Sequence, residues 1–324
     1  QKIPGIGEVN AKRIKNKNVL QKAEKEVLFI EKNKIDVSFY TDKNFPRRLK
    51  NCVDAPVILY SKGNLNLNEH YVISIVGTRN ATDYGKQVCN DLVRQFSERN
   101  YKILVVSGLA YGIDIQAHKS ALRYNIPTAG VVAHGLDKLY PSLHKETARK
   151  MLQKGGLVSD FPSETKIDPA NFIRRNRIVA GLADATIVVE SAAKGGALIT
   201  ADIASSYNRD VFAFPGRSGD TYSTGCNQLI KNSGANLIEG IDDLEYFMGW
   251  EQNNKKEAFQ SSLFVELTGE EEKITSLLQE KGELFIDQIS SDLKIPVSKI
   301  SSILLSLEFK NVLSALPGKM YKLR

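Results

Sequence analysis

The amino-acid sequence predicts an α/β protein whose central domain is a doubly wound, Rossmann-like parallel sheet. From Tyr71 to Ile238, apolar runs of strand length alternate with stretches of helix length, which is the pattern of a parallel sheet covered by helices. Glycine-containing turns follow several of these runs directly. Between Asn171 and Ile230 the unit of strand, turn and helix repeats, and backbone N–H groups at the start of such helices can hold anions. The sequence therefore predicts a phosphate-binding surface.

Successive strands of the central domain are expected at regular intervals. Residues 71–76 lead through a turn into a helix over about 83–98, and residues 103–106 lead into a helix that continues through His118. The later strands span residues 127–133, 157–160, 186–190, 211–214 and 236–238. In a doubly wound sheet, ligands bind at the carboxyl ends of the strands where strand order reverses, so the turns after these strands are expected to converge.

A helical module of residues 1–38 precedes the central domain, which we place at residues 39–248. Residues 3–14 contain a Pro-Gly-x-Gly turn followed by Ala-Lys-Arg-Ile, as in the hairpin and second helix of a helix–hairpin–helix motif. The first helix of that motif would precede Gln1, so the module is expected to be truncated. An ordinary turn at the start of a helix is the alternative. Residues 19–31 have the apolar spacing of an amphipathic helix.

A linker over residues 249–266 and a winged-helix-like domain over residues 267–324 complete the predicted organisation. The linker lacks apolar periodicity, and three helices plus a terminal hairpin are expected after it. The third helix, over 297–309, is poor in basic residues, since Lys299 and Lys310 are offset by Glu308 and several serines. A DNA-reading helix needs more hydrogen-bond donors, so we favour a protein-contact or auxiliary role.

Composition and charge narrow the class of protein. The 324 residues are 42% hydrophobic and 25% charged, and the net charge is +7, which is ordinary for a globular protein. The basic excess lies in residues 1–70, with 14 Lys or Arg against 8 Asp or Glu; it favours a polyanionic partner, with a solvated lysine-rich helix as the alternative.

No apolar stretch approaches the roughly 20 residues of a membrane span, so no membrane insertion is expected. Three scattered cysteines fit a reducing cytoplasm and no disulfide or zinc site. The start, Gln1-Lys-Ile-Pro, is neither a signal peptide nor a natural initiation site, so we also expect residues before it.

The first two turns of the sheet carry the groups that bind phosphate. Gly77 allows close approach of a phosphate to the backbone, Thr78 supplies a hydroxyl, and Arg79 supplies a planar guanidinium. Ser107 and Gly108 repeat the arrangement after the next strand. A surface salt bridge is the alternative role for Arg79.

Further candidates lie on a loop and on two later helix starts. Lys138 and Tyr140 combine a cation with an aromatic ring, as single-stranded nucleic acid requires, although Tyr140 packing on Pro141 is equally compatible. Around Asn176, three arginines spread about the helix, so Arg175 and Asn176 are expected to point inward and one arginine to form an internal ion pair. The most specific phosphate-type turn is Lys194-Gly195-Gly196.

Catalytic motifs are missing from the sequence. Neither Gly-x-Ser-x-Gly, a Walker loop nor Gly-x-Gly-x-x-Gly is present, and His118, His134 and His144 have neither metal-ligand spacing nor an adjacent nucleophile. We therefore expect no enzyme activity, no catalytic residue, no metal and no cofactor.

Taken together, the motifs closely resemble the DNA-processing protein A family (DprA/Smf) of bacterial natural transformation. The resemblance covers about residues 40–240, in order and with matching spacing. It is carried by Val76-Gly-Thr-Arg79, Ser107-Gly-Leu-Ala-Tyr-Gly-Ile-Asp114, Gly135-Leu-Asp-Lys-Leu-Tyr-Pro141, Arg174-Arg-Asn-Arg-Ile-Val-Ala-Gly181, Gly195-Gly-Ala-Leu-Ile-Thr200 and Phe214-Pro-Gly216.

The resemblance implies a protein that binds single-stranded DNA without sequence preference, protects incoming DNA, forms homodimers and helps to load the RecA recombinase. It also implies residue roles. Gly77, Thr78 and Arg79 are expected to grip phosphate; Ser107, Gly108, Lys138 and Asn176 to line the pocket; Lys194, Gly195 and Gly196 to lie nearby; and Tyr140 to contact a base. One departure is Gly195, which stands where a serine is common.

A nucleotide-cleaving phosphoribohydrolase of related fold is the alternative function. Such enzymes carry Pro-Gly-Gly-x-Gly-Thr, whereas here no proline precedes Gly195-Gly196, and Ala197-Leu198 replaces the Gly-Thr. A scaffold whose basic face is incidental is a third hypothesis.

Overall fold

The computed structural model describes residues 18–250, 267–310, 312–316 and 318–323. The chain divides into two compact units between Leu237 and Ile238. The predicted helix–hairpin–helix turn and residues 251–266 of the predicted linker lie outside the described residues.

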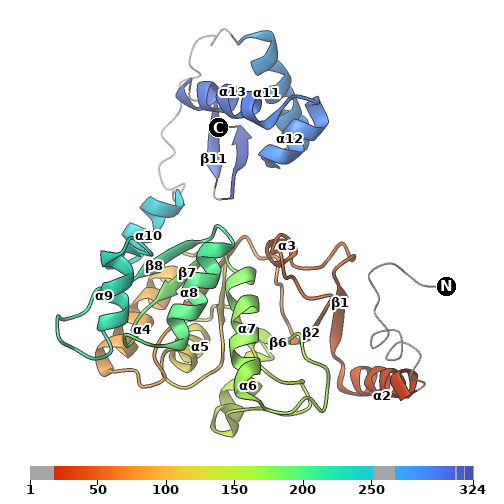
Figure 1. Cartoon of the computed structure of the whole chain (residues 1–324), viewed down its shortest axis with the longest axis vertical. Coiled ribbons are helices and arrows are strands. Elements are labelled where there is room, and N and C mark those ends of the chain that lie inside the picture. The colour runs from red at the N-terminus through yellow and green to blue at the C-terminus, as the bar shows by residue number, and fades with distance from the viewer. Residues whose placement is uncertain (1–17, 251–266, 311, 317, 324) are drawn as a thin grey trace, which may run out of the picture. The chain divides into compact units, whose positions relative to one another are not determined.

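The first unit contains one large, mostly parallel sheet (Figure 1), whose strands follow the order β1-β2-β6-β5-β4-β3-β7-β8-β9. All pairs from β6 to β9 in this order are parallel, whereas β1 and β2 are antiparallel at one edge. The strands are β1 (Asp36–Phe39), β2 (Ile58–Gly63), β3 (Tyr71–Val76), β4 (Ile103–Ser107), β5 (Thr128–Val131), β6 (Gly155–Ser159), β7 (Ala185–Val188), β8 (Asp210–Ala213) and β9 (Asn236–Leu237).

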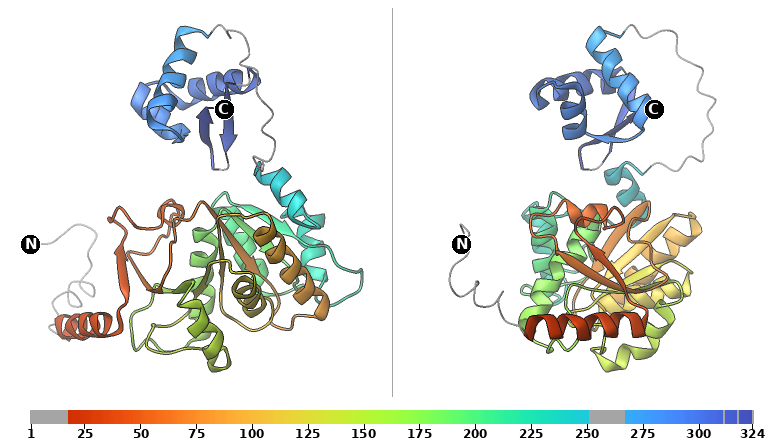
Figure 2. Two further views of the ribbon diagram at one scale, coloured as in Figure 1. Left: turned by 180° about the vertical axis from the view of Figure 1, so that it is seen from behind. Right: turned by 90° about the vertical axis from the view of Figure 1, so that its right-hand side faces the viewer.

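Helices cover both faces of this sheet. Helix α4 packs beside α5 and α7 beside α8, and the two pairs lie on opposite faces (Figures 1 and 2). The helices are α2 (Asn18–Asn33), α3 (Arg47–Lys50), α4 (Asp83–Glu98), α5 (Ile113–Arg123), α6 (Lys145–Met151), α7 (Pro169–Leu182), α8 (Gly196–Ser206) and α9 (Thr224–Lys231), with a 3-10 turn, η1, at Ser142–His144. The predicted doubly wound fold is confirmed.

Strand order reverses between β3 and β7. From β3 the chain adds β4, β5 and β6 on one side, and it then returns to place β7, β8 and β9 on the other. The central strands are buried on both faces, as Val72, Ile73, Ile75 and Ile187 show, because helices cover them. The carboxyl ends of β3 and β7 therefore form the switch point at which such folds bind ligands.

The antiparallel edge extends the sheet beyond the strands that the sequence predicts. Strand β1 begins at Asp36, before residue 39, where we placed the start of the central domain. It pairs with β2, which joins the parallel strands through β6. Both strands are partly exposed, so they lack the continuous apolar run that identifies a central strand.

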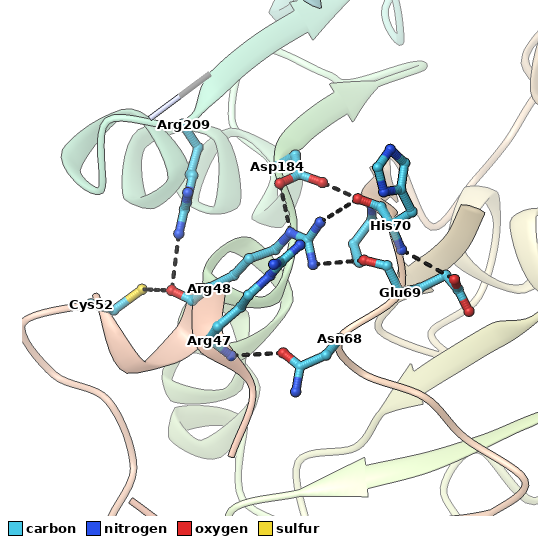
Figure 3. A network of polar contacts seen from close by, with 9 residues as sticks. Arg47, Arg48, Cys52, Asn68, Glu69, His70, Asp184 and Arg209 are labelled. Carbon is cyan, nitrogen blue, oxygen red and sulfur yellow. Dashed lines mark hydrogen bonds and ion pairs between the residues drawn. The ribbon is translucent and has the colours of Figure 1, made fainter. Parts of the chain in front are cut away.

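A polar clamp closes the amino ends of β3 and β7 (Figure 3). The buried guanidinium of Arg48, on α3, pairs with Asp184 at 2.6 Å and donates to the carbonyls of Glu69 and His70. The second Asp184 oxygen accepts the backbone N–H of Val72 at 2.9 Å. Arg48 thus ties the segment before β3 to the start of β7 at the end of the sheet opposite the switch point.

The second unit contains a winged helix. Helices α11 (Gly269–Lys281), α12 (Ile286–Leu293) and α13 (Val297–Phe309) accompany a small sheet of β10 (Leu284–Phe285), β12 (Met320–Leu323) and β11 (Leu313–Leu316); α10 (Ile241–Met248) precedes them. Its separate core includes Ile274, Ile289, Ile300, Leu304 and Leu313. The three helices and the terminal hairpin are as predicted. Across the described residues, no helix is both long and apolar enough to cross a bilayer.

Candidate nucleic-acid interface

A cavity of about 660 Å³ lies at the switch point of the sheet. The backbone N–H of Thr78, after β3, donates to the carbonyl of Glu190, after β7, at 2.7 Å. This bond joins the two diverging turns, so that one site receives residues from both. Ten predicted site residues line the cavity: Gly77, Thr78, Arg79, Gly108, Tyr140, Arg175, Asn176, Lys194, Gly195 and Gly196.

The start of α8 forms an uncapped wall of this cavity. Gly195 is the N-cap, and it has no side chain to accept the first helical N–H groups. A Cβ built on Gly196 would meet nothing within 4 Å. Because the N-terminus of a helix carries partial positive charge and unpaired donors, this wall suits an anion such as a phosphate oxygen.

Two of the cations that line the cavity have no carboxylate partner among the described residues. Arg79 and Lys194 are both exposed, and neither forms an ion pair with any residue that the structure describes. The guanidinium of Arg79 lies 5.8 Å from the ring centroid of Phe172. An aromatic ring beneath a guanidinium holds its position while leaving its charge available. The salt-bridge alternative for Arg79 is therefore not what the structure shows.

Arg175 and Asp114 form a buried charged pair at the floor of the cavity. Arg175 is 4% exposed and donates to the carbonyl of Val131. Burial lowers the pKa of Arg175 and raises the pKa of Asp114, although each charge opposes the other's shift. A Cβ at Gly108 would lie 2.1 Å from an Arg175 nitrogen and 2.5 Å from an Asp114 oxygen. Glycine at 108 is thus required by the pair itself.

The three arginines around Asn176 serve different purposes. Arg175 points inward, as predicted, but its charge is balanced internally by Asp114. Arg177 pairs with Asp160, whose side chain is 3% exposed, and this is the internal ion pair expected for one of the three. Asn176 donates to the carbonyl of Gly196 at 3.4 Å. Its amide therefore links α7 to the glycine turn at the start of α8.

An apolar wall of the cavity was not identified from the sequence. Ile167, Pro169, Phe172 and Ile173 line it beside Tyr140, and the ring centroids of Tyr140 and Phe172 are 5.9 Å apart in an edge-to-face arrangement. The signal was present, because Phe172 and Asn176 are one helical turn apart on α7 and so share a face.

Two predicted site residues lie outside the cavity lining. Ser107 is fully buried within β4, and its hydroxyl donates to the carbonyl of Ile75 at 2.6 Å; it holds strands together and is not accessible to a ligand. Lys138 sits 3.4 Å from the carboxylate of the adjacent Asp137. Its contact with nucleic acid stays a prediction.

The histidines have structural roles, as expected. His118 pairs with Thr128 at 2.7 Å, and burial lowers the pKa of His118 to about 3. His134 accepts the backbone N–H of Tyr140 at 3.1 Å, which fixes the loop that carries the tyrosine. His144 contacts the carbonyl of Leu109 at 2.9 Å. Among residues with a described position, no group of three or more His, Cys, Asp or Glu could hold a metal ion.

The fold and the cavity define a Rossmann-like protein with a cavity lined by cations at its switch point and a winged-helix module. Residues 36–249 match the family model of DNA recombination-mediator protein A, and residues 265–319 match the DprA winged helix domain. The chain belongs to this DprA/Smf family. The assignment does not favour the phosphoribohydrolase alternative.

Curated relatives and solved structures agree with the assignment. The DNA processing protein DprA of Bacillus subtilis is 40% identical over 63% of this chain and 68% of its own length. Protein Smf of Synechocystis is 32% identical over 87% and 79%. The X-ray structure of DprA from Streptococcus pneumoniae has a TM-score of 0.63 and 33% identity, covering 68% of this chain and 77% of that one. A Helicobacter pylori DprA structure, whose description concerns its single-stranded DNA binding mode, has a TM-score of 0.59 and 27% identity, over 67% and 96%.

Proposed function

We propose that this protein binds single-stranded DNA at the switch-point cavity, without sequence preference, and acts as a recombination mediator during natural transformation. The observation that carries the proposal is the combination of unpaired Arg79 and Lys194 with the uncapped start of α8 in one cavity. Backbone amides and cations contact phosphates, which all nucleotides share, so they confer affinity but no sequence information.

The aromatic wall favours a single strand over a duplex. Tyr140 is 44% exposed at the cavity, next to the ring of Phe172. Rings of this kind stack on unpaired bases of any sequence, whereas the bases of a duplex already stack on one another. The H. pylori relative, described as binding single-stranded DNA, supports the same ligand.

The finer roles rest on the family. We propose that the protein protects incoming strands, helps to load the RecA recombinase, works as a homodimer in the cytoplasm and catalyses no reaction. Sedimentation of the purified chain tests the homodimer, and capture by immobilised RecA tests the contact with the recombinase. Incubation with a panel of nucleoside monophosphates tests the absence of catalysis. Release of free base in the last assay would contradict a purely binding role.

Replacing Arg79 by alanine tests the site. A hydrogen bond to a charged group contributes about 1.5–3 kcal/mol, so we expect Arg79→Ala to weaken oligo-dT binding by about 10- to 100-fold in fluorescence anisotropy. Lys194→Ala and Lys138→Ala are read in the same assay. Affinity is also expected to fall with salt, with a slope of about −0.7 for each phosphate neutralised.

Arg94→Ala is the matched control. Arg94 is a partly exposed arginine on α4 that pairs with Glu98 at 2.7 Å and does not line the cavity. It is expected to bind like wild type. Equal affinity of Arg79→Ala and wild type, or displacement of labelled oligo-dT by duplex as readily as by single strand, would overturn the proposed function.

A further inference from the structure

A second cavity, of about 820 Å³, adjoins the first, and the proposed function assigns no ligand to it. Tyr222 lines both cavities. The second is bounded by the start of α4, at Thr82 and Tyr84, and by the loop that joins β8 to α9, including Pro215, Gly216 and Arg217. This loop contains the Phe-Pro-Gly motif, none of whose residues lines the first cavity.

The loop around the second cavity is held in place on both sides. The amide of Asn227 accepts the backbone N–H of Gly216 at 3.1 Å and donates to its carbonyl at 2.9 Å. The carbonyl of Tyr222 accepts the N–H of Ser191 at 2.7 Å. Because these bonds fix the loop to α9 and to the end of β7, the cavity walls exist before any ligand arrives.

Tyr84 provides an oriented aromatic surface at this cavity. Its hydroxyl donates to the carbonyl of Pro215 at 2.9 Å, across from α4 to the loop. The residue is nevertheless 50% exposed. A ring that is tethered at its hydroxyl and open to solvent loses little freedom when a base stacks on it.

The charged residues of the second cavity favour a base over a phosphate in its interior. Glu190 is 3% exposed, and its carboxylate accepts the hydroxyl and the backbone N–H of Thr82, so this wall is acidic. Asp220 adds a second carboxylate to the lining. Both repel phosphate. Arg217 is exposed and has no ion-pair partner within the part of the chain that the structure describes, so it can take a phosphate outside while the base lies inward.

We propose that the second cavity is a base-stacking subsite for the neighbouring nucleotide of the same DNA strand. Tyr84 is its stacking platform and Arg217 its phosphate contact. Tyr222 lies between the two nucleotides. This inference rests on the proposed function, because it requires single-stranded DNA in the first cavity.

The test compares oligo-dT affinities of single variants by fluorescence anisotropy. Tyr84→Ala is expected to weaken binding by about 5- to 150-fold, the usual effect of losing one stacked base. Tyr84→Phe keeps the ring but loses the hydroxyl tether to Pro215, so it is expected to weaken binding less than Tyr84→Ala. Arg217→Ala removes one phosphate contact and is expected to reduce the magnitude of the salt slope by about 0.7.

Tyr40→Ala is the matched control for tyrosine loss. Tyr40 is 42% exposed and follows edge strand β1, outside both cavities; wild-type binding is expected. Arg217→Ala keeps the test valid if Tyr84→Ala does not fold, because the exposed Arg217 side chain has no ion pair to lose.

Arg79→Ala separates the two proposals. If Arg79→Ala weakens binding while the Tyr84 and Arg217 variants bind like wild type with an unchanged salt slope, the subsite is wrong and the proposed function stands. If Arg79→Ala itself has wild-type affinity, the proposed function fails first.

Discussion

At the scale of single residues, two glycines in the same cavity have different surroundings. Gly108 lies against the buried pair of Arg175 and Asp114, so the folded protein itself excludes a side chain there. Gly196 faces open space, since an added Cβ meets nothing within 4 Å. Any restriction at Gly196 must therefore come from a ligand that approaches the backbone closely.

Alanine substitution distinguishes these two reasons. Gly196→Ala is expected to leave stability unchanged or to raise it by about 0.4–1 kcal/mol, yet to weaken oligo-dT binding because the new methyl group occupies the position of the phosphate. Gly108→Ala is expected to destabilise the fold by about 1–3 kcal/mol through overpacking. Urea unfolding and anisotropy measure the two effects. Unimpaired binding by Gly196→Ala would remove α8 from the interface.

At the scale of elements, a buried carboxylate joins helices α11 and α13 of the winged helix. Glu271, on α11, accepts hydrogen bonds from Lys310 at 2.7 Å, Ser306 at 2.8 Å and the backbone of Thr268 at 2.8 Å. These bonds, of which the one from Lys310 contributes most, lower the pKa of Glu271 to about 2. Lys299, in the first turn of α13, pairs with Glu270 at 2.5 Å, so the lysines at both ends of this helix are paired with carboxylates.

The lowered pKa of Glu271 predicts how stability depends on pH. Because the folded form holds the carboxylate ionised below its ordinary pKa of 4.5, its contribution is complete above about pH 4.5 and is lost as the pH falls towards 2. Thermal unfolding of a 267–324 fragment, which has its own core, is expected to show this loss. Glu271→Gln should flatten that part of the profile, whereas Glu270→Gln, in an exposed pair, should not. A profile unaffected by Glu271→Gln would contradict the assignment.

At the scale of the whole molecule, all residues of the proposed DNA site lie in the first unit. Residues 268–324 contain 8 basic and 8 acidic residues, and the cations at both ends of α13 are paired with carboxylates. Such a module attracts a polyanion weakly. The predicted protein-contact or auxiliary role of this module accordingly remains our proposal.

Removing the second module tests this division. A chain that ends at Trp250 is expected to bind oligo-dT within about twofold of the full chain, with the same salt slope, because it keeps both cavities and their unpaired cations. Anisotropy at several salt concentrations measures this. A loss of several units of slope would place phosphate contacts on the winged helix instead.

The sequence by itself determined the chain order of the parallel strands and their helices, the doubly wound class and ten of the residues that line the first cavity. Periodic apolar runs and Gly-containing turns are local signals, and in a parallel sheet the carboxyl ends necessarily share one edge. It also indicated the winged helix from three helices and a hairpin.

Only the tertiary structure decided which side chains are available to a ligand. It buried Ser107 in β4, balanced Arg175 with Asp114 and placed Phe172 beside Tyr140. It also brought Tyr84 next to Pro215, far along the chain. Burial and charge pairing depend on contacts between distant segments, and no local pattern of residues encodes them.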